Sequence, residues 1–158
     1  MNVKTRRSQN IRDEVRKWLN QFDWDTEITL TFSNDISEHQ ARQTLKRFWN
    51  RVDKCLYGNA VRNFNKRCER MNLLEGQRNV SRFHFHILAR LPTDRFSTVT
   101  EFCDYLREQW RVENSNNYIV SFHPIKNRDR YTNYSTKSIG RNDCDTLVID
   151  SSHISAAS

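Results

Sequence analysis

The sequence predicts an α+β protein built on a central antiparallel sheet of four or five strands. Segments with helical spacing and segments with strand alternation follow one another in the order α, β, α, β, β, α, β, α. The 158 residues include only three Gly and two Pro, too few for the many tight turns of an all-β sandwich or barrel. The inner β-α-β-β-α-β order is typical of the ferredoxin-like arrangement, in which helices pack on one face of the sheet and leave the other face free.

Four segments have the spacing of amphipathic helices. The first covers about residues 11–22, where apolar side chains recur every three or four positions. The second follows Ser37 and Gln40, which match a capping box. The third and fourth are expected at about 98–110 and 128–138.

Four further segments are predicted to be extended. Residues 27–32 alternate and are rich in β-branched side chains, and 82–90 alternate up to Pro92. Residues 61–75 and 118–122 are the other two, with a hairpin loop at 76–81. The chain is predicted to form one domain over residues 1–158, with its core at about 24–140 and a tail at 141–158.

The charge distribution indicates a polyanionic partner. The net charge is +7 and the pI about 9.5, and residues 42–82 hold eleven Lys and Arg against three acidic residues. Such a block suggests nucleic acid, although it would also suit a solvated basic face. The sequence has no apolar run long enough for a bilayer, no secretory signal and four scattered cysteines. We therefore expect a cytoplasmic protein with reduced thiols and no membrane partner.

The stretch around His84 and His86 is the sharpest chemical feature. Alternate side chains of a strand share one face, so both histidines and Arg90 should lie opposite the apolar side chains between them. Two imidazoles two residues apart on a strand can chelate one metal ion. Glu75, across the predicted hairpin, can supply a third ligand. The alternative is a pair of histidines and a surface charge on a solvated face.

Tyr131, Tyr134 and Lys137 form the second feature. Residues three apart on a helix are neighbours, so Lys137 should lie beside Tyr134. A tyrosine that attacks phosphorus must lose a proton from a group with a pKa of ~10. A nearby ammonium or metal ion favours that loss. The alternative is a helix with two packing tyrosines and a surface lysine.

Taken together and in this order, these features closely resemble the HUH endonuclease superfamily, specifically the replication-initiator (Rep) proteins of small plasmids and phages. The resemblance covers about residues 27–140. It implies that His84, His86 and Glu75 bind Mn²⁺ or Mg²⁺. It further implies that Tyr134 is the nucleophile and that Lys137 orients the substrate or balances charge.

The activity that the resemblance implies is the nicking and joining of single-stranded DNA at an origin or hairpin. A 5′-phosphotyrosine intermediate would start rolling-circle replication. The sequence has no G-x-x-x-x-G-K-[ST] loop, so unwinding is expected to come from a host helicase, unless the DNA is already single-stranded. The residues expected to contact DNA are Thr29, Thr31, Arg42, Lys46, Arg47, Arg82, Arg90 and Tyr131.

Two alternatives stay open. A single-tyrosine transposase of the same superfamily usually takes its third ligand from the tyrosine helix. The residue four after Tyr134 is Ser138, a poor ligand, whereas Glu75 is well placed, which favours an initiator. A catalytically silent nucleic-acid-binding module of the same fold would bind without forming an adduct. A relaxase is disfavoured because His123 lies too far along to be its third histidine, and a cupin because position 90 is Arg.

Overall fold

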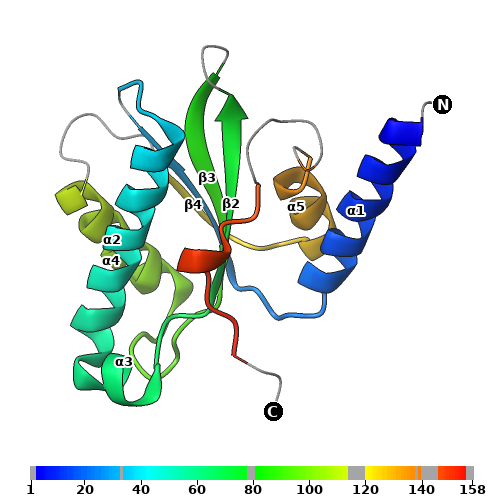
Figure 1. Cartoon of the computed structure of the whole chain (residues 1–158). Coiled ribbons are helices and arrows are strands. Elements are labelled where there is room, and N and C mark those ends of the chain that lie inside the picture. The colour runs from blue at the N-terminus through cyan, green and yellow to red at the C-terminus, as the bar shows by residue number, and fades with distance from the viewer. Residues whose placement is uncertain are drawn as a thin grey trace.

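The computed structural model describes residues 3–32, 34–77, 81–113, 120–137, 139 and 146–155. Figure 1 shows the order of the elements along the chain. They are α1 (Val3–Leu19), β1 (Thr26–Thr31), α2 (Glu38–Tyr57), α3 (Asn59–Phe64), β2 (Arg70–Gln77), β3 (Ser81–Ala89), α4 (Val99–Glu113), β4 (Val120–Pro124), α5 (Arg128–Ser135) and the 3-10 helix η1 (Ile149–Ser151).

The four strands form one antiparallel sheet in the order β2-β3-β1-β4. With α2 and α4 as the two connections, this is the βαββαβ pattern of a ferredoxin-like α+β fold, and it confirms the predicted fold class. The C-terminal segment 146–155 adds two isolated bridges to β2, at Leu73–Leu147 and Arg70–His153.

The main core lies between the sheet and the layer of α2 and α4. Alternate residues of β1 and β3, such as Ile28 and Phe85, meet Trp49 of α2 and Trp110 of α4 there, and all four are fully buried. Helix α2 starts at the predicted capping box, in which Ser37 and Gln40 bond reciprocally. It ends at Gly58, whose φ of 52° is readily adopted only by glycine.

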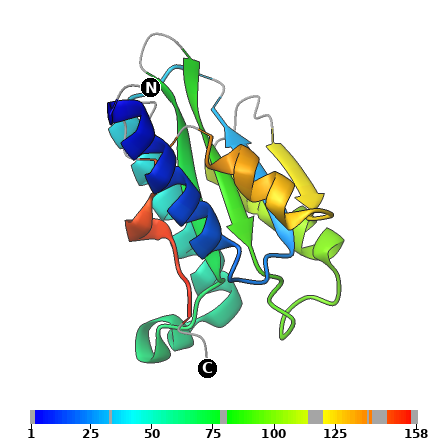
Figure 2. The ribbon, with the colours of Figure 1, turned by 90° about the vertical axis from the view of Figure 1, so that its right-hand side faces the viewer.

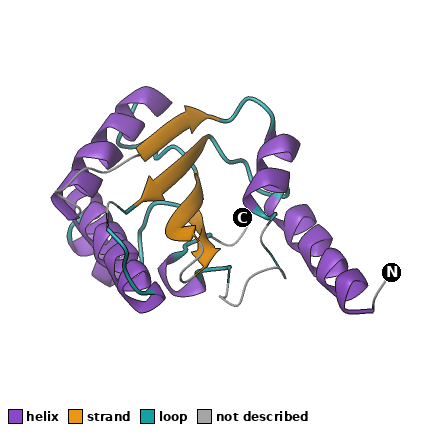
Figure 3. Ribbon diagram, turned by 90° about the horizontal axis from the view of Figure 1, so that it is seen from above, coloured by secondary structure: helices purple, strands orange, loops and turns teal. Residues whose placement is uncertain are grey.

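Helices α1 and α5 lie over the opposite face of the sheet, as Figures 2 and 3 show. Met71 and Leu73 of β2 and Leu88 of β3 are buried there against Leu19 and Tyr131. The sequence-based expectation that this face is free is therefore wrong for the part beneath the two helices. The remaining part, towards β1 and β4, carries the polar side chains.

Several boundaries differ from the predicted ones. Residues 61–64 belong to α3 and are not extended, because α2 stops at Gly58 and a short helical turn follows before β2 begins at Arg70. Helix α5 ends at Ser135, and Thr136 and Lys137 form a turn. Strands β2 and β3 reach into the predicted hairpin loop, of which residues 78–80 lie outside the described residues, as do 118 and 119 of the last predicted strand.

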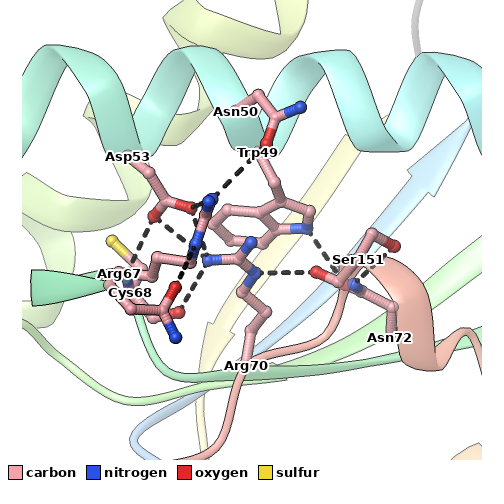
Figure 4. Close-up of polar contacts among 9 residues, drawn as sticks. Trp49, Asn50, Asp53, Arg67, Cys68, Arg70, Asn72 and Ser151 are labelled. Carbon is pink, nitrogen blue, oxygen red and sulfur yellow. Dashed lines mark hydrogen bonds and ion pairs between the residues drawn. The ribbon is translucent and has the colours of Figure 1, made fainter. Parts of the chain in front are cut away.

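A buried polar network ties the C-terminal segment to the core (Figure 4). Asp53 of α2 is fully buried and accepts hydrogen bonds from Arg70 of β2, with N–O distances of 2.9 and 3.0 Å. Arg70 also donates to the Ser151 carbonyl at 2.9 Å, and Asn72 joins Trp49 to the Ser151 hydroxyl. The core therefore extends past residue 140 into the predicted tail.

Candidate metal and tyrosine site

Strand pairing brings the predicted ligands into adjacent rows on the face covered by α5. Directly opposite residues of an antiparallel pair share a face. Glu75 of β2 lies opposite His84 of β3, which lies opposite Thr31 of β1. The next row places His86 opposite Thr29. The predicted alternation of residues 83–89 is confirmed, because the phenylalanines between the histidines enter the main core.

Glu75, His84 and His86 form a group that can hold a metal ion. One carboxylate oxygen of Glu75 lies 2.8 Å from Nε2 of His86 and 3.5 Å from Nε2 of His84. The three ligand atoms all lie within 4.8 Å of one another. Neighbouring ligands of a six-coordinate ion with bonds of about 2.1 Å are roughly 3 Å apart, so the group fits a divalent ion with small movements. Two imidazoles and one carboxylate suit Mn²⁺ and related ions and leave coordination positions for other ligands.

The remaining ring nitrogens of both histidines already have partners. Nδ1 of His84 donates to the Arg82 carbonyl oxygen at 3.1 Å, which leaves Nε2 as the ring nitrogen that faces Glu75. Nδ1 of His86 lies 3.3 Å from the hydroxyl of Thr29. Such outer contacts orient metal-binding histidines and fix their tautomers. Burial alone would lower the pKa of His84, but Glu75 and the Arg82 carbonyl outweigh it and raise the pKa.

A β-bulge directly after Glu75 shapes the hairpin. The pairing register shifts between Glu75 and Gln77, and Gly76 between them has a φ of 120°. A Cβ at Gly76 would lie 2.6 Å from the Arg82 carbonyl oxygen, so only glycine fits. The same carbonyl accepts from His84, and the bulge thus holds the backbone that orients this ligand.

Helix α5 places Tyr134 beside the histidines. Its side chain is 52% exposed, and its ring centroid lies 5.3 Å from that of His86. Lys137 lies 4.0 Å above the Tyr134 ring and forms an ion pair of 3.2 Å with the second carboxylate oxygen of Glu75. Burial opposes the charge on Lys137 most strongly of any single cause, but Tyr134 and Glu75 together outweigh it and raise the lysine pKa.

Two sets of contacts fix the position of α5. Its first turn is capped by Asn127, whose side chain accepts from the Arg130 backbone at 3.0 Å. Helix α1 lies alongside, where Arg12 donates to both the backbone and side-chain oxygens of Asn133. Asn20 at the end of α1 accepts from Thr132 at 2.9 Å. The nucleophile candidate is therefore held from both ends of its helix.

Tyr131 has a different environment from Tyr134. It is only 9% exposed and belongs to the apolar cluster between the sheet and α1. Burial raises its pKa well above the ordinary value, which disfavours a phenolate. Of the two tyrosines, Tyr134 alone presents its side chain to solvent next to the metal-binding group.

Four of the basic residues predicted to contact DNA lie away from the histidines. Arg42, Lys46 and Arg47 lie on α2, across the sheet from the histidines, and the two arginines pair with Glu38 and Glu113. Arg90 pairs with Glu69 at 2.8 Å and lies beyond the end of β3, roughly 13 Å along the strand from His86.

The other predicted contacts lie close to the site. Arg82 lies two residues before His84 on β3 and pairs with Asp35 at 3.4 Å. Thr29 and Thr31 are half-buried on the same face as the histidines, as the alternation of residues 27–32 predicts.

A groove of about 760 Å³ adjoins the site, and the sequence patterns did not predict it. Its walls share Thr29 and Tyr134 with the metal-binding region. The other residues that line it are Glu27, Ser121, His123, Pro124, Lys126, Asn127, Arg130 and Tyr131. Glu27 and His123 lie opposite one another on β1 and β4. The sequence offers one signal for this groove: Glu27 and Thr29 are two residues apart on a predicted strand and therefore share a face.

No family model, curated protein or solved structure matches this chain. Among the described residues, no helix has both the length and the apolar character that a membrane crossing needs. The chemistry of the site therefore has to follow from its own geometry.

Proposed function

We propose that this protein is a metal-dependent endonuclease and strand transferase that nicks single-stranded DNA with Tyr134 as the nucleophile. The observation that carries the proposal is the shared carboxylate of Glu75. One of its oxygens contacts both histidines, and the other binds Lys137, which lies over the Tyr134 ring. A potential metal centre, a cation and an exposed phenol thus meet at one point, as transfer of a phosphoryl group to tyrosine requires.

The residues of the chain have separable roles in this reaction. His84, His86 and Glu75 would hold Mn²⁺ or Mg²⁺, and the bound ion would supply a positive charge that polarises the scissile phosphate. The Tyr134 oxygen bonds to phosphorus while the bond from phosphorus to the 3′ oxygen breaks. The phenol proton leaves to water and the released 3′ oxygen takes one up. The 5′-phosphotyrosine link retains the bond energy, so a 3′-hydroxyl can reverse the step.

Lys137 acts in this scheme as a positive charge and not as a base. Its pKa is raised by Glu75 and Tyr134, so the side chain stays an ammonium at neutral pH. An ammonium close to the phenol stabilises the phenolate and lowers the cost of its formation.

The resemblance to replication initiators extends the proposal to the start of rolling-circle replication. The third ligand comes from β2 and not from α5, which favours an initiator over a single-tyrosine transposase. The cations around the groove, Lys126 and Arg130, and those along α1 provide a positive surface on the side of the site. The partners are single-stranded DNA and, for unwinding, a host helicase.

A denaturing gel tests the proposal. The protein is mixed with a pool of single-stranded oligonucleotides in Mn²⁺ or in EDTA. We expect a band shift that resists denaturation, depends on Mn²⁺ and disappears in Tyr134→Phe. Tyr105→Phe on α4, across the sheet from the histidines, is the matched control and should keep the shift. An adduct that persists in Tyr134→Phe would refute the assignment of the nucleophile. An adduct equally strong in EDTA would refute the metal.

A further inference from the structure

Glu27 is a carboxylate without a partner in the groove next to Tyr134. The side chain lies on the face of the sheet that carries the histidines, one row beyond Thr29. Within the described part of the chain, no hydrogen bond or ion pair satisfies its carboxylate oxygens. Half-buried carboxylates are usually paired, because removing the charge from water is costly. Because Glu27 lines the groove, its oxygens can accept a hydrogen bond from a ligand that binds there.

The basic residues of the groove, Lys126 and Arg130, do not form ion pairs with Glu27. His123 and Arg130 line the same groove but neither forms an ion pair with Glu27. Burial raises the pKa of Glu27 by more than His123 and Arg130 lower it. The groove therefore combines an open acceptor with positive charges at a distance, which complements a ligand that has both an N–H donor and an anionic group.

The groove also continues directly into the proposed site of phosphoryl transfer. Tyr134 and Thr29 belong to both, since Thr29 also contacts His86 and Tyr134 packs on the same ring. A phosphate held at the metal-binding group would have its neighbouring nucleotide in the groove. Its base would meet Glu27, and the adjoining phosphate would meet Arg130 or Lys126.

Resting on the function proposed above, we infer that the Glu27 groove is the subsite for the base next to the scissile phosphate. We further infer that it selects a base with an exocyclic amine over thymine. Cytosine, adenine and guanine each offer an amine that a carboxylate accepts. Thymine offers only one ring N–H, flanked by two carbonyl oxygens that repel a carboxylate. Glu27 is thus a specificity-determining residue of the chain.

The first experiment measures binding and needs no knowledge of the nick site. Fluorescently labelled dC, dA and dT oligonucleotides of equal length are titrated with the protein in EDTA, so that binding is read without cleavage. We expect dC and dA to bind more tightly than dT, by roughly tenfold for one carboxylate–base contact. In Glu27→Gln the ratio should fall to within twofold, because the amide can also donate to a thymine carbonyl.

A matched control separates this effect from a general change in charge. Glu108→Gln removes one negative charge from α4, where Glu108 is exposed beside Arg111. It should keep the wild-type ratio. An unchanged ratio in Glu27→Gln, or no preference against dT in the wild type, would overturn the inference.

The second experiment links the preference to the reaction. On a cleavable oligonucleotide, each position beside the nick is replaced by each of the four bases. We expect one position at which thymine lowers the rate of adduct formation in the wild type and does so much less in Glu27→Gln. A thymine penalty of equal size in both proteins would overturn the inference. If no DNA gives an adduct while the binding preference depends on Glu27, the proposed nuclease function fails and the base subsite stands.

Discussion

Replacing Thr29 by Val removes one hydroxyl from β1 and leaves the shape and β-branching of the side chain almost unchanged. The hydroxyl lies 3.3 Å from Nδ1 of His86, and it is the contact that orients this ring from behind. Loss of an outer partner of a metal-binding histidine typically weakens metal affinity by 10- to 100-fold. Because 3.3 Å is longer than the usual hydrogen bond to a hydroxyl, we expect the lower end, about tenfold. This corresponds to about 1.4 kcal/mol of binding free energy.

Isothermal titration with Mn²⁺ in the absence of DNA measures this change directly. The matched control is Thr100→Val, an exposed position on α4 far from the histidines, which should leave the affinity unchanged. Thermal unfolding in EDTA checks that Thr29→Val is folded, since valine suits a strand at least as well as threonine. Affinity within twofold of the wild type in a folded Thr29→Val protein would refute the idea that Thr29 orients the ligand.

Three further predictions concern the rest of the chain. Asp53→Ala leaves the Arg70 guanidinium buried without its partner, and we expect the free energy of unfolding in urea to fall by about 3–5 kcal/mol; a fall below about 1 kcal/mol would contradict the structure. The raised pKa of His84 stabilises the metal-free fold fully below the unfolded pKa of about 6.5, and this contribution is lost as the pH rises through the folded value. Stability in EDTA should therefore drop from pH 6 to pH 8, and less so in His84→Gln. Burial, with the charge of Asp53, raises the pKa of Cys68 to about 12, so iodoacetamide at pH 8 should label exposed Cys55 well before Cys68, as peptide mass spectrometry would show.

Local patterns predicted the part of the site that depends on strand geometry. The two-residue period of a strand is enough to separate His84 and His86 from the phenylalanines between them. A hairpin of known length is enough to bring Glu75 to the same end of the sheet. The three-residue spacing of Tyr134 and Lys137 held even though the helix ends at Ser135, because the turn that follows keeps the lysine over the ring.

The remaining features depend on long-range packing, for which the chain has only weak local signals. Leu88 follows His84 and His86 on the same face of β3 but is apolar. This break in the polar alternation is the one local signal of the apolar contact with α1. Linear charge density could not show that the basic residues of α2 face away from the histidines, because the side on which a connecting helix packs is a property of the topology. The unpaired state of Glu27 depends on the placement of β4, which is remote in sequence.

The two carboxylate oxygens of Glu75 contact two different parts of the molecule. Through one oxygen it belongs to the β2–β3 hairpin, and through the other it secures the turn after α5. In the structure without an ion, Lys137 pairs with the negative charge of Glu75. A bound ion would compete with Lys137 for the negative charge of Glu75. The ion pair that holds Lys137 over the Tyr134 ring would then be weaker when the ion is bound than when it is absent. Loading and release of the metal would in this way set how freely Tyr134 moves towards its phosphate.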